Sequence, residues 1–343
     1  MPGSPAEMGS GLRPLLFSIA YGMTGSVGDA EDIVQDAFLG MTKARQAGTA
    51  IADEKAYLTT AVTRLGINYL RSARVRRETY VGDWLPEPVV VPAGPPGPEE
   101  HAELADSLSM AFLVLLEALS PVERAVFMLR EVFGYGYPDV AAITGKTESN
   151  CRQIFARARQ HIAAGGPRRD STARDSTARD STVRDSTVRD STARDSTARD
   201  SAPVAERRAA GEELARRFFE AAAGGDMDAL LGMLAPDVVF HGDGGGKAQA
   251  VAKPVAGRER VLRFLAGLFR RGVVMGVWLR LAWVNGQPGA VTYDPEGRVI
   301  SVFELDVTDG VVQAIHSVVN PDKLGHLGPV SDLARKPQAE DVR

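Results

Sequence analysis

The sequence has a single cysteine, no long apolar run and no leader-like N-terminus. Cys151 stands alone among 343 residues, which excludes an intramolecular disulfide framework and is typical of a reducing cytoplasm. The apolar stretch at residues 113–116 ends at Glu117, far short of the length that spans a membrane. The N-terminus lacks the basic and apolar segments of a secretory signal. These absences predict a cytoplasmic protein without membrane contact.

Net charge is small as well, because 40 lysines and arginines are set against 44 aspartates and glutamates. Affinity for nucleic acid must therefore come from local basic patches rather than from the whole chain. The length of the chain predicts two or three domains.

Residues 120–162 have the pattern of a helix-turn-helix. Ser120 and Glu123 form a capping box around a proline at the first helical position. A short second helix begins at residue 137 and ends at Gly145, and Thr147 caps a third helix. The alternative interpretation is a three-helix packing unit with a solvated basic face.

The third of these helices presents polar side chains outward. Its first turns carry groups that hydrogen-bond base edges, and its later turns carry arginines that suit phosphates, as a helix in the major groove requires. The candidate DNA-binding residues here are Thr147, Ser149, Asn150, Arg152, Gln153, Arg157 and Arg159. Cys151 lies among them, and a small neutral helix residue is a simpler interpretation of it than a redox switch.

Residues 11–80 have the apolar spacing of helices. The segment at residues 29–41 has one acidic side, which predicts either a solvated face or a docking face for a basic partner. A further helix, residues 54–77, ends in a dense run of arginines with Tyr57 and Tyr69 among them, a combination typical of surfaces that bind single-stranded nucleic acid. The arginines of this run are Arg64, Arg71, Arg74, Arg76 and Arg77.

Two segments are not predicted to fold by themselves. Residues 81–99 contain six prolines, which forbid a helix and predict a semi-rigid linker, whose Trp84 anchors it to a neighbouring surface. From Arg169 the pentapeptide Arg-Asp-Ser-Thr-Ala/Val occurs six times. Its period of five gives no apolar face and its side chains cannot offset the ordering entropy, so we expect a flexible tether.

The remainder, from residue 204, predicts an α+β domain in which a curved antiparallel sheet wraps helices. Helices are expected at residues 206–223, 227–234 and 257–271. Strands are expected at residues 238–241, 274–284, 289–293, 299–307 and 311–319, with turns at Asn285-Gly286 and Asp309-Gly310 between them.

Residues 11–162 resemble an extracytoplasmic-function sigma factor, the two-domain class of bacterial transcription initiation factors. AEDIVQDAF (residues 30–38) is similar to the family's polymerase-docking helix, and TRLGINYLRSARVRRETYVG (63–82) to its promoter-melting and minus-ten helix. The helix-turn-helix resembles the domain that reads the minus-thirty-five element, and the C-terminal part resembles a SnoaL-like domain of the nuclear-transport-factor-two fold. Sigma factors with this extension carry three signatures, which occur here at residues 84–88, 243–247 and 320–324.

The resemblance implies a multidomain protein with two all-α sigma domains and an α+β extension. The expected division is 9–80 for sigma region 2, 81–105 for the linker, 106–165 for sigma region 4, 166–203 for the tether, 204–325 for the SnoaL-like domain and 326–343 for the tail. Core RNA polymerase and promoter DNA are the implied partners. The family usually has an acid where Asn68 stands, so base preference near the minus-ten element is expected to differ.

The resemblance also implies roles for individual residues. The polymerase-docking residues are Asp32, Gln35, Asp36 and Phe38, and Tyr57 and Asn68 join the arginine run at the opened DNA strand. The regulatory residues are Trp84, Pro86, Glu87, Asp243, Gly244, Gly245, Gly246, Lys247, Asn320, Pro321, Asp322, Lys323 and Leu324. We expect the extension to lie against the first sigma domain and the linker, with Lys247 and Asp322 in or near that contact.

Catalysis by the extension is not expected. Its candidate groups are His241, Asp243 and His316, and one acid without an oxyanion donor pair makes a poor isomerase site. The glycine turn at residues 244–246 lacks the spacing of a nucleotide-binding loop, and neither a cofactor nor a metal is expected. A built-in regulator in place of a separate anti-sigma protein, with an unidentified small ligand as a further partner, is the favoured interpretation. The alternative is a helix-turn-helix regulator with a ligand-sensing or weakly enzymatic domain.

Overall fold

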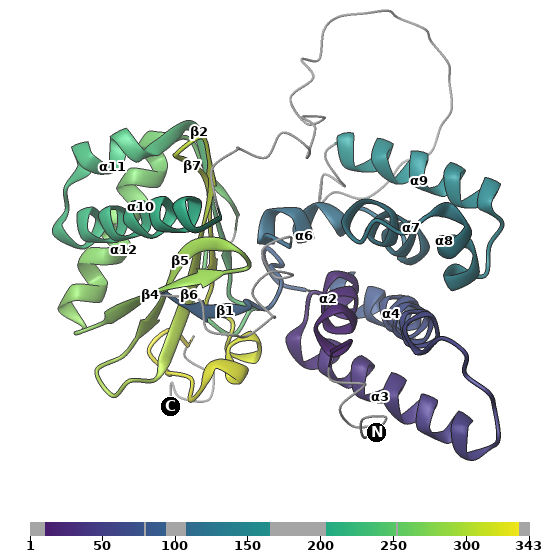
Figure 1. Ribbon diagram of the computed structural model, residues 1–343. Coiled ribbons are helices and arrows are strands. Elements are labelled where there is room, and N and C mark those ends of the chain that lie inside the picture. The colour runs from purple at the N-terminus through teal and green to yellow at the C-terminus, as the bar shows by residue number, and fades with distance from the viewer. Residues whose placement is uncertain (1–10, 79, 94–107, 165–203, 252, 336–343) are drawn as a thin grey trace, which may run out of the picture.

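The computed structural model describes residues 11–78, 80–93, 108–164, 204–251 and 253–335 (Figure 1). The pentapeptide tract, the tail beyond residue 335 and the expected helix start near residue 101 lie outside these residues. Two helical units stand on one side of the molecule and a sheet with its own helices on the other, with the linker between them. None of the described helices is long and apolar enough to cross a bilayer.

The first helical unit consists of α2 (Arg13–Thr24), α3 (Val27–Gln46) and α4 (Glu54–Glu78). Gly25, with a φ of 66°, ends α2, and the Ser26 hydroxyl caps α3 by accepting a hydrogen bond from the Asp29 amide at 3.2 Å. The apolar side of α3 is buried as its spacing predicts, which leaves the acidic side facing solvent.

The second helical unit consists of α6 (Met110–Leu116), α7 (Pro121–Phe127), a π-helical turn η1 (Met128–Val132), α8 (Tyr137–Thr144) and α9 (Glu148–Ala163). The capping box of Ser120 and Glu123 is confirmed, as are the left-handed Gly145 and the Thr147 cap. Cys151 is fully buried on the inner side of α9, in keeping with a packing role.

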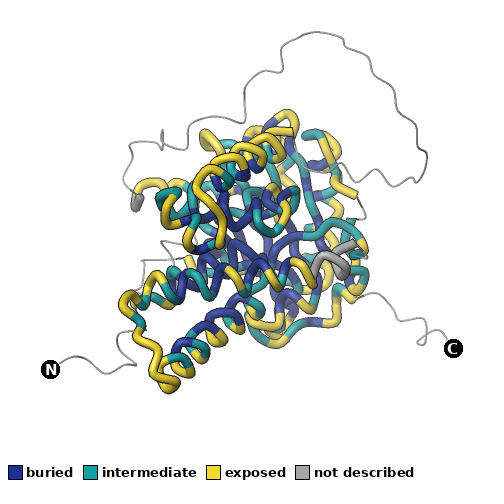
Figure 2. The backbone as a smooth tube through the Cα atoms, turned by 90° about the vertical axis from the view of Figure 1, so that its right-hand side faces the viewer, coloured by how far each residue is buried: buried dark blue, intermediate teal, exposed yellow. Residues whose placement is uncertain are grey.

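The two helical units share one hydrophobic core. Leu16, Leu58 and other side chains of the first unit lie in the same buried cluster as Leu113 and Phe127 of the second. The helices approach closely at Gly22, where a β-carbon would lie 2.2 Å from Cε of Met128. Buried segments gather toward the centre of the view, and exposed segments lie mostly toward its edge (Figure 2).

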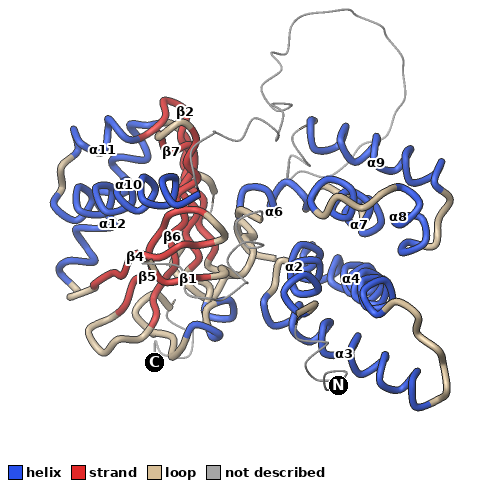
Figure 3. Tube along the Cα trace, in the orientation of Figure 1, coloured by secondary structure: helices blue, strands red, loops and turns tan. Residues whose placement is uncertain are grey.

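The C-terminal domain is a seven-stranded sheet with helices on one face (Figure 3). Its helices are α10 (Val204–Gly224), α11 (Met227–Met233) and α12 (Arg258–Val274). Its strands are β2 (Leu234–Asp243), β3 (Val255–Ala256), β4 (Trp278–Val284), β5 (Gln287–Tyr293), β6 (Val299–Thr308) and β7 (Val311–Val318), followed by the 3-10 turns η2 (Pro321–Lys323) and η3 (Gly325–Leu327). The order is β1-β4-β5-β6-β7-β2-β3, and of the pairs formed by these described strands only β2 and β7 are parallel.

The strand β1 (Val90–Pro92) comes from the linker and pairs antiparallel with β4. The sequence did not predict this strand, because proline is compatible with a strand only at an edge, where its missing amide is not needed. The linker is therefore a part of the C-terminal sheet rather than a spacer beside it.

The predicted start of a strand at Val274 is wrong. Helix α12 continues to Val274, and the chain turns at Gly276, with a φ of 70°, before β4 begins at Trp278. The pair Val273 and Val274 favours a strand by composition, but both side chains are exposed and neither residue takes part in the pairing of β4 with β5. The predicted class of two helical domains and a curved-sheet domain is confirmed.

Successive side chains of each strand point to opposite faces of the sheet, so neighbouring residues lie in different environments. Phe240, Phe303 and Ile315 face α10–α12 in the domain's own core. Val302 and Val318 face the other way, in a buried cluster with Leu85 of the linker and Met110 of α6. The face of the sheet that its own helices leave uncovered is thus covered by the linker and the second helical unit.

Gly289 of β5 is expected to be essential for the sheet. A β-carbon there would lie 2.1 Å from the Phe303 carbonyl oxygen on the neighbouring strand, so Gly289→Ala should lower the free energy of unfolding by about 1–3 kcal/mol or more. Gly267→Ala in α12 is the matched control, since its β-carbon meets nothing within 4 Å and alanine should stabilise the helix by about 0.5–1 kcal/mol. Chemical denaturation of both variants measures this, and equal stabilities would contradict the expectation.

Candidate interdomain and nucleic-acid interfaces

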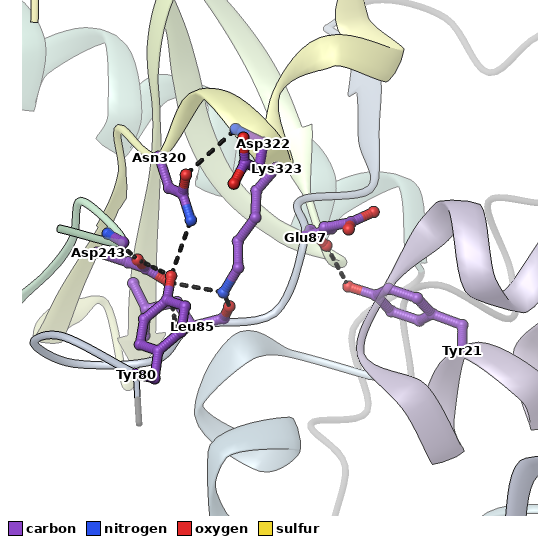
Figure 4. A network of polar contacts seen from close by, with 9 residues as sticks. Tyr21, Tyr80, Leu85, Glu87, Asp243, Asn320, Asp322 and Lys323 are labelled. Atoms are coloured by element: carbon purple, nitrogen blue, oxygen red, sulfur yellow. Dashed lines mark hydrogen bonds and ion pairs between the residues drawn. The ribbon is translucent and has the colours of Figure 1, made fainter. Parts of the chain in front are cut away.

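Asp243, at the end of β2, is fully buried and lies where the linker meets the C-terminal domain (Figure 4). Its carboxylate accepts hydrogen bonds from the Leu85 amide at 2.8 Å, the Gly245 amide at 3.0 Å and the Tyr80 hydroxyl. It also pairs with the Lys323 ammonium at 2.7 Å. One carboxylate therefore joins the linker, the glycine turn and the C-terminal signature; we call these groups the Asp243 network.

Lys323 provides the charge that balances Asp243. Its ammonium group also donates to the Leu85 carbonyl and lies over the rings of Tyr80 and Trp84, 4.9 and 4.5 Å from their centroids. These aromatic faces stabilise a cation that is largely removed from water. The sequence marked Lys323 only as a member of its signature and gave no sign that it, rather than Lys247, contacts the linker.

Tyr80 completes the network as a hydrogen-bond donor. Burial, and then the neighbouring Asp243 charge, raise the pKa of Tyr80 above its ordinary value, so the hydroxyl keeps its proton. Its oxygen accepts a hydrogen bond from the Asn320 side-chain amide at 2.8 Å. Asn320 in turn caps η2 by accepting from the Asp322 amide at 3.1 Å.

The other end of the linker signature binds the first helical unit. The Glu87 carboxylate accepts from the Val27 amide at 2.7 Å at the start of α3, and the Glu87 amide donates to the Gly25 carbonyl at 2.8 Å. The Tyr21 hydroxyl donates to the Glu87 carbonyl at 2.6 Å. Trp84 covers Gly25 so closely that a β-carbon there would lie 2.6 Å from the indole ring. Trp84 is therefore anchored to a surface.

Asn285 connects three parts of the chain, and the sequence predicted for it only a turn. It has a left-handed φ of 52° between β4 and β5, and its side-chain amide donates to the Tyr21 hydroxyl at 2.7 Å and to the Leu108 carbonyl at 3.1 Å. Its side-chain oxygen accepts from the Val89 amide at 3.1 Å. The first helical unit, the segment before α6 and the linker thus meet at one residue.

The remaining regulatory candidates surround this contact. A β-carbon at Gly245, with a φ of 57°, would lie 2.2 Å from the Asn320 side chain, so the glycine turn fits against the C-terminal signature. Lys247 and Asp322 bond to each other at 2.6 Å, but both side chains are more than half exposed. The others lie at the linker, in the turn or beside it: Pro86, Gly244, Gly246, Pro321 and Leu324.

The two helical units are also joined by polar contacts across their shared core. Arg64 of α4 donates to the Ile143 carbonyl of α8 at 3.2 Å. The buried Arg124 of α7 donates to the Gly22 carbonyl of α2 at 2.9 Å and pairs with Glu117. Arg64, a candidate for DNA binding, is therefore engaged by the second helical unit.

Most candidate polymerase-binding and DNA-binding residues lie at the surface. On α3, Phe38 is half-buried and packs on the core, whereas Asp32 and its neighbours face solvent. The exposed candidates are Asp32, Gln35, Asp36, Asn68, Arg71, Thr147, Ser149, Arg152, Gln153, Arg157 and Arg159, with Tyr57 and Asn150 half-buried. The side chains of Arg74, Arg76 and Arg77 lie outside the described part of the structure.

The C-terminal domain has a partly open cavity of about 180 Å³ on the helix-covered face of the sheet. Its lining is mainly apolar, with the hydroxyl groups of Thr292, Ser301 and Ser317 among the polar contributions. His241, Asp243 and His316 are absent from this lining, since strand alternation directs them to the linker face. Within the described residues no cluster of three or more histidine, cysteine or acidic side chains is placed to hold a metal.

Comparison with known families divides the chain in three. Residues 10–76 match sigma-70 region 2, residues 109–162 match sigma-70 region 4, and residues 215–319 match the SnoaL-like domain.

Individual relatives extend the similarity over nearly the whole chain. The ECF RNA polymerase sigma factor SigJ of Mycobacterium tuberculosis is 36% identical over 319 residues, which cover 91% of this chain and 90% of the relative. A probable ECF RNA polymerase sigma factor, SigI, of the same species is 29% identical over 92% of this chain and 93% of its own. The crystal structure of SigJ superposes with a TM-score of 0.66 at 32% identity, covering 94% of this chain and 98% of that one.

We expect Asp243→Asn to detach the linker. The substitution removes the carboxylate charge that pairs with the buried Lys323, and breaking such a pair destabilises by about 3–5 kcal/mol. Hydrogen exchange of residues 80–93 should therefore accelerate. Lys247→Gln is the control, because an exposed ion pair contributes about 0–1 kcal/mol. Unchanged exchange in Asp243→Asn would show that the linker is held by other contacts.

Proposed function

The chain belongs to the extracytoplasmic-function RNA polymerase sigma factors, and from this premise we propose that the conformation described above is a closed, inactive one. In it the SnoaL-like domain, through the Asp243 network, holds the linker and keeps regions 2 and 4 together. The observation that carries the proposal is the core shared by the two helical units, with Arg64 bound to Ile143 across it.

The distance between promoter elements supports this interpretation. A minus-ten and a minus-thirty-five element lie roughly 80 Å apart along B-DNA, at about 3.4 Å per base pair. Two units that share a core and a hydrogen bond between α4 and α8 cannot reach both elements at once. Initiation therefore requires that the units separate and that Arg64 be released.

We propose that the candidate polymerase-binding and DNA-binding surfaces differ in their accessibility in the closed conformation. The acidic side of α3, with Asp32 and Asp36, is exposed and would dock on a basic element of core RNA polymerase. The outer side of α9 is exposed as well and would read base edges through Arg152 and Gln153. On α4, the strand-binding helix, Arg64 is held by the Ile143 carbonyl of α8. Closure would thus allow docking while preventing simultaneous reading of both elements.

We propose that the SnoaL-like domain regulates rather than catalyses. The candidate acids and bases lie on the sheet face opposite the cavity, so none of them meets a molecule bound there. The cavity is close to the size of a site that admits a benzene-sized molecule, and a small apolar ligand would fit its lining. Gly242 lines the cavity and is followed by Asp243, so such a ligand would lie next to the Asp243 network.

The helix-turn-helix repressor is not favoured. A repressor needs neither the exposed acidic side of α3 nor the arginine-rich α4. Both helices lie in the segment that matches sigma-70 region 2. Binding of promoter duplex by the chain alone would favour a repressor, whereas binding only together with core polymerase favours a sigma factor.

Opening the closed conformation should increase transcription. Run-off assays with core polymerase should give roughly 5- to 150-fold more transcript with Asp243→Asn than with the full natural chain, the range expected for a coupling of about 1–3 kcal/mol. Polymerase binding should not change, and Lys247→Gln should match the natural chain. Equal or lower output from both Asp243→Asn and a chain ending at residue 203 would contradict closure.

Two arginines of α9 should behave differently in promoter binding by the holoenzyme. Arg152 lies in the first turns, so Arg152→Ala should weaken recognition at particular base positions by about 1–3 kcal/mol. Arg157 lies further along, so Arg157→Ala should weaken binding evenly over sequences and reduce the salt slope by about one. Binding titrations at several salt concentrations separate the two, and identical profiles would refute the assignment.

A further inference from the structure

A second polar cluster lies on the linker face of the sheet, and sequence analysis did not predict it as a cluster. Glu304 of β6, His316 of β7 and His241 of β2 are direct neighbours in the strand register and form one row across three strands. Glu304 is fully buried and His316 is 3% exposed. Sequence alone offered the two histidines as separate candidates, because it does not give the register that places Glu304 beside them.

This row connects the C-terminal domain with both of its neighbours. One Glu304 carboxylate oxygen accepts from the Met110 amide at the start of α6, at 3.0 Å. The other lies 2.6 Å from Nδ1 of His316. The His316 ring stacks on the His241 ring with centroids 5.2 Å apart, and Nδ1 of His241 lies 3.2 Å from the Asp83 carboxylate of the linker.

The charge of Glu304 depends on the protonation of His316. A buried carboxylate is tolerated only when a cation and hydrogen bonds compensate it, and the described residues around it offer the His316 imidazole as that cation. Burial alone would lower the pKa of His316, but the Glu304 and Asp306 charges outweigh it and raise that pKa above its ordinary value. The closed chain thus favours the imidazolium form of His316.

The charged groups near His316 favour the same state. Asp306 on β6 is largely buried, and burial and the Glu304 charge raise its pKa too. Asp83 of the linker contributes a further negative charge, and His241 on β2 stacks on the ring. From α6 the described side chains that face the sheet are apolar, Met110 and Val114. Among the described residues, then, His316 faces carboxylates and one imidazole.

We propose that the Glu304–His316 pair is a proton-dependent latch that fastens α6 of region 4 and the linker to the SnoaL-like sheet. The proposal deepens the closed conformation proposed above and rests on it. Deprotonation of His316 leaves Glu304 as a buried charge without a cation, which destabilises the closed chain and favours an open one in which the contact with Met110 is lost. An alkaline shift therefore opens the chain, and an acidic shift closes it.

The sign follows from proton linkage. The pKa of His316 is raised in the closed chain, so its contribution to closure is complete below the pKa of the open chain. That contribution is lost as pH rises through the pKa of the closed chain. The raised pKa of Asp306 acts in the same direction, because the closed chain binds the additional proton. Each unit of difference in pKa changes the opening equilibrium up to about tenfold.

The test follows the His316 imidazole and the α6 amides in the full chain. The chain has five histidines, so carbon-13 labelled imidazole signals can be assigned by single His→Gln variants and titrated by NMR. The pKa of His316 should exceed 6.5. Exchange at the Met110 amide, corrected for the intrinsic pH dependence, should rise up to about tenfold for each pH unit that crosses this pKa.

Two variants distinguish the latch from a structural role. Glu304→Gln should lower the pKa of His316 and abolish the corrected pH dependence at Met110. Asp83→Asn, an exchange at a partly exposed side chain, should lower the pKa of His316 by less and serves if Glu304→Gln does not fold. His161→Gln is the control, since His161 is exposed on α9 and should change neither quantity.

The outcomes separate the latch from the closed conformation. A neutral His316 below pH 6.5, or protection at Met110 that does not vary with pH, overturns the latch while closure stands. Absence of protection of α6 and of residues 80–93 at every pH overturns both. A pKa of His316 that stays raised in Glu304→Gln also overturns the proposal, because another group would then hold the proton.

Discussion

A carboxylate removed from water must be surrounded by donors, and Asp243 is the group on which the arrangement of this molecule depends. Its donors come from the linker, the glycine turn and the C-terminal signature. An unmatched buried charge destabilises by several kcal/mol, so the segments are held together as a set. Because the same linker continues to Glu87 at the start of α3, the position of the first helical unit is coupled to Asp243.

The two-residue period of the strands gives the C-terminal sheet two separate uses. One face, under α10–α12, contains the apolar cavity. The other carries the Asp243 network and the Glu304–His316 pair and is covered by the linker and α6. Gly242 and Asp243 are adjacent in sequence yet belong to different faces. A residue that lines the cavity and the residue that holds the linker are therefore joined by a single peptide bond.

Local features of the fold could be predicted from the sequence, and long-range ones could not. The capping box at Ser120 and the left-handed Gly145 depend on neighbours a few positions away, so their patterns were sufficient. Glu304 and Asn285 contact residues 177 to 264 positions distant, and only the packing of the helical units against the sheet brings these together. The linker strand was missed because its prolines exclude a helix without indicating an edge strand.

The candidate site likewise has features that could be predicted from the sequence and features that could not. The three signatures marked Trp84, Asp243 and Asn320, and the structure brings these segments into one network. The sequence could not predict which lysine of the two signatures is buried. Lys323 points into the Asp243 network and Lys247 is exposed, because the turns in which they lie direct the two side chains differently. Val274 was assigned to a strand because two consecutive β-branched residues are compatible with the periodicity of a strand as well as of a helix. The turn at Gly276 shows that the helix continues through them.

The order of the elements along the chain is also the order in which they are synthesised. The helical units are complete at the end of α9, whereas Lys323 lies roughly 160 residues later. A ribosome adds about 5–20 residues per second, so a growing chain spends roughly 8–30 seconds with both units made and their covering domain unfinished. On the closed conformation proposed above, each newly synthesised molecule passes through an interval in which its helical units are not yet held by the C-terminal domain, and the rate of translation sets the duration of this interval.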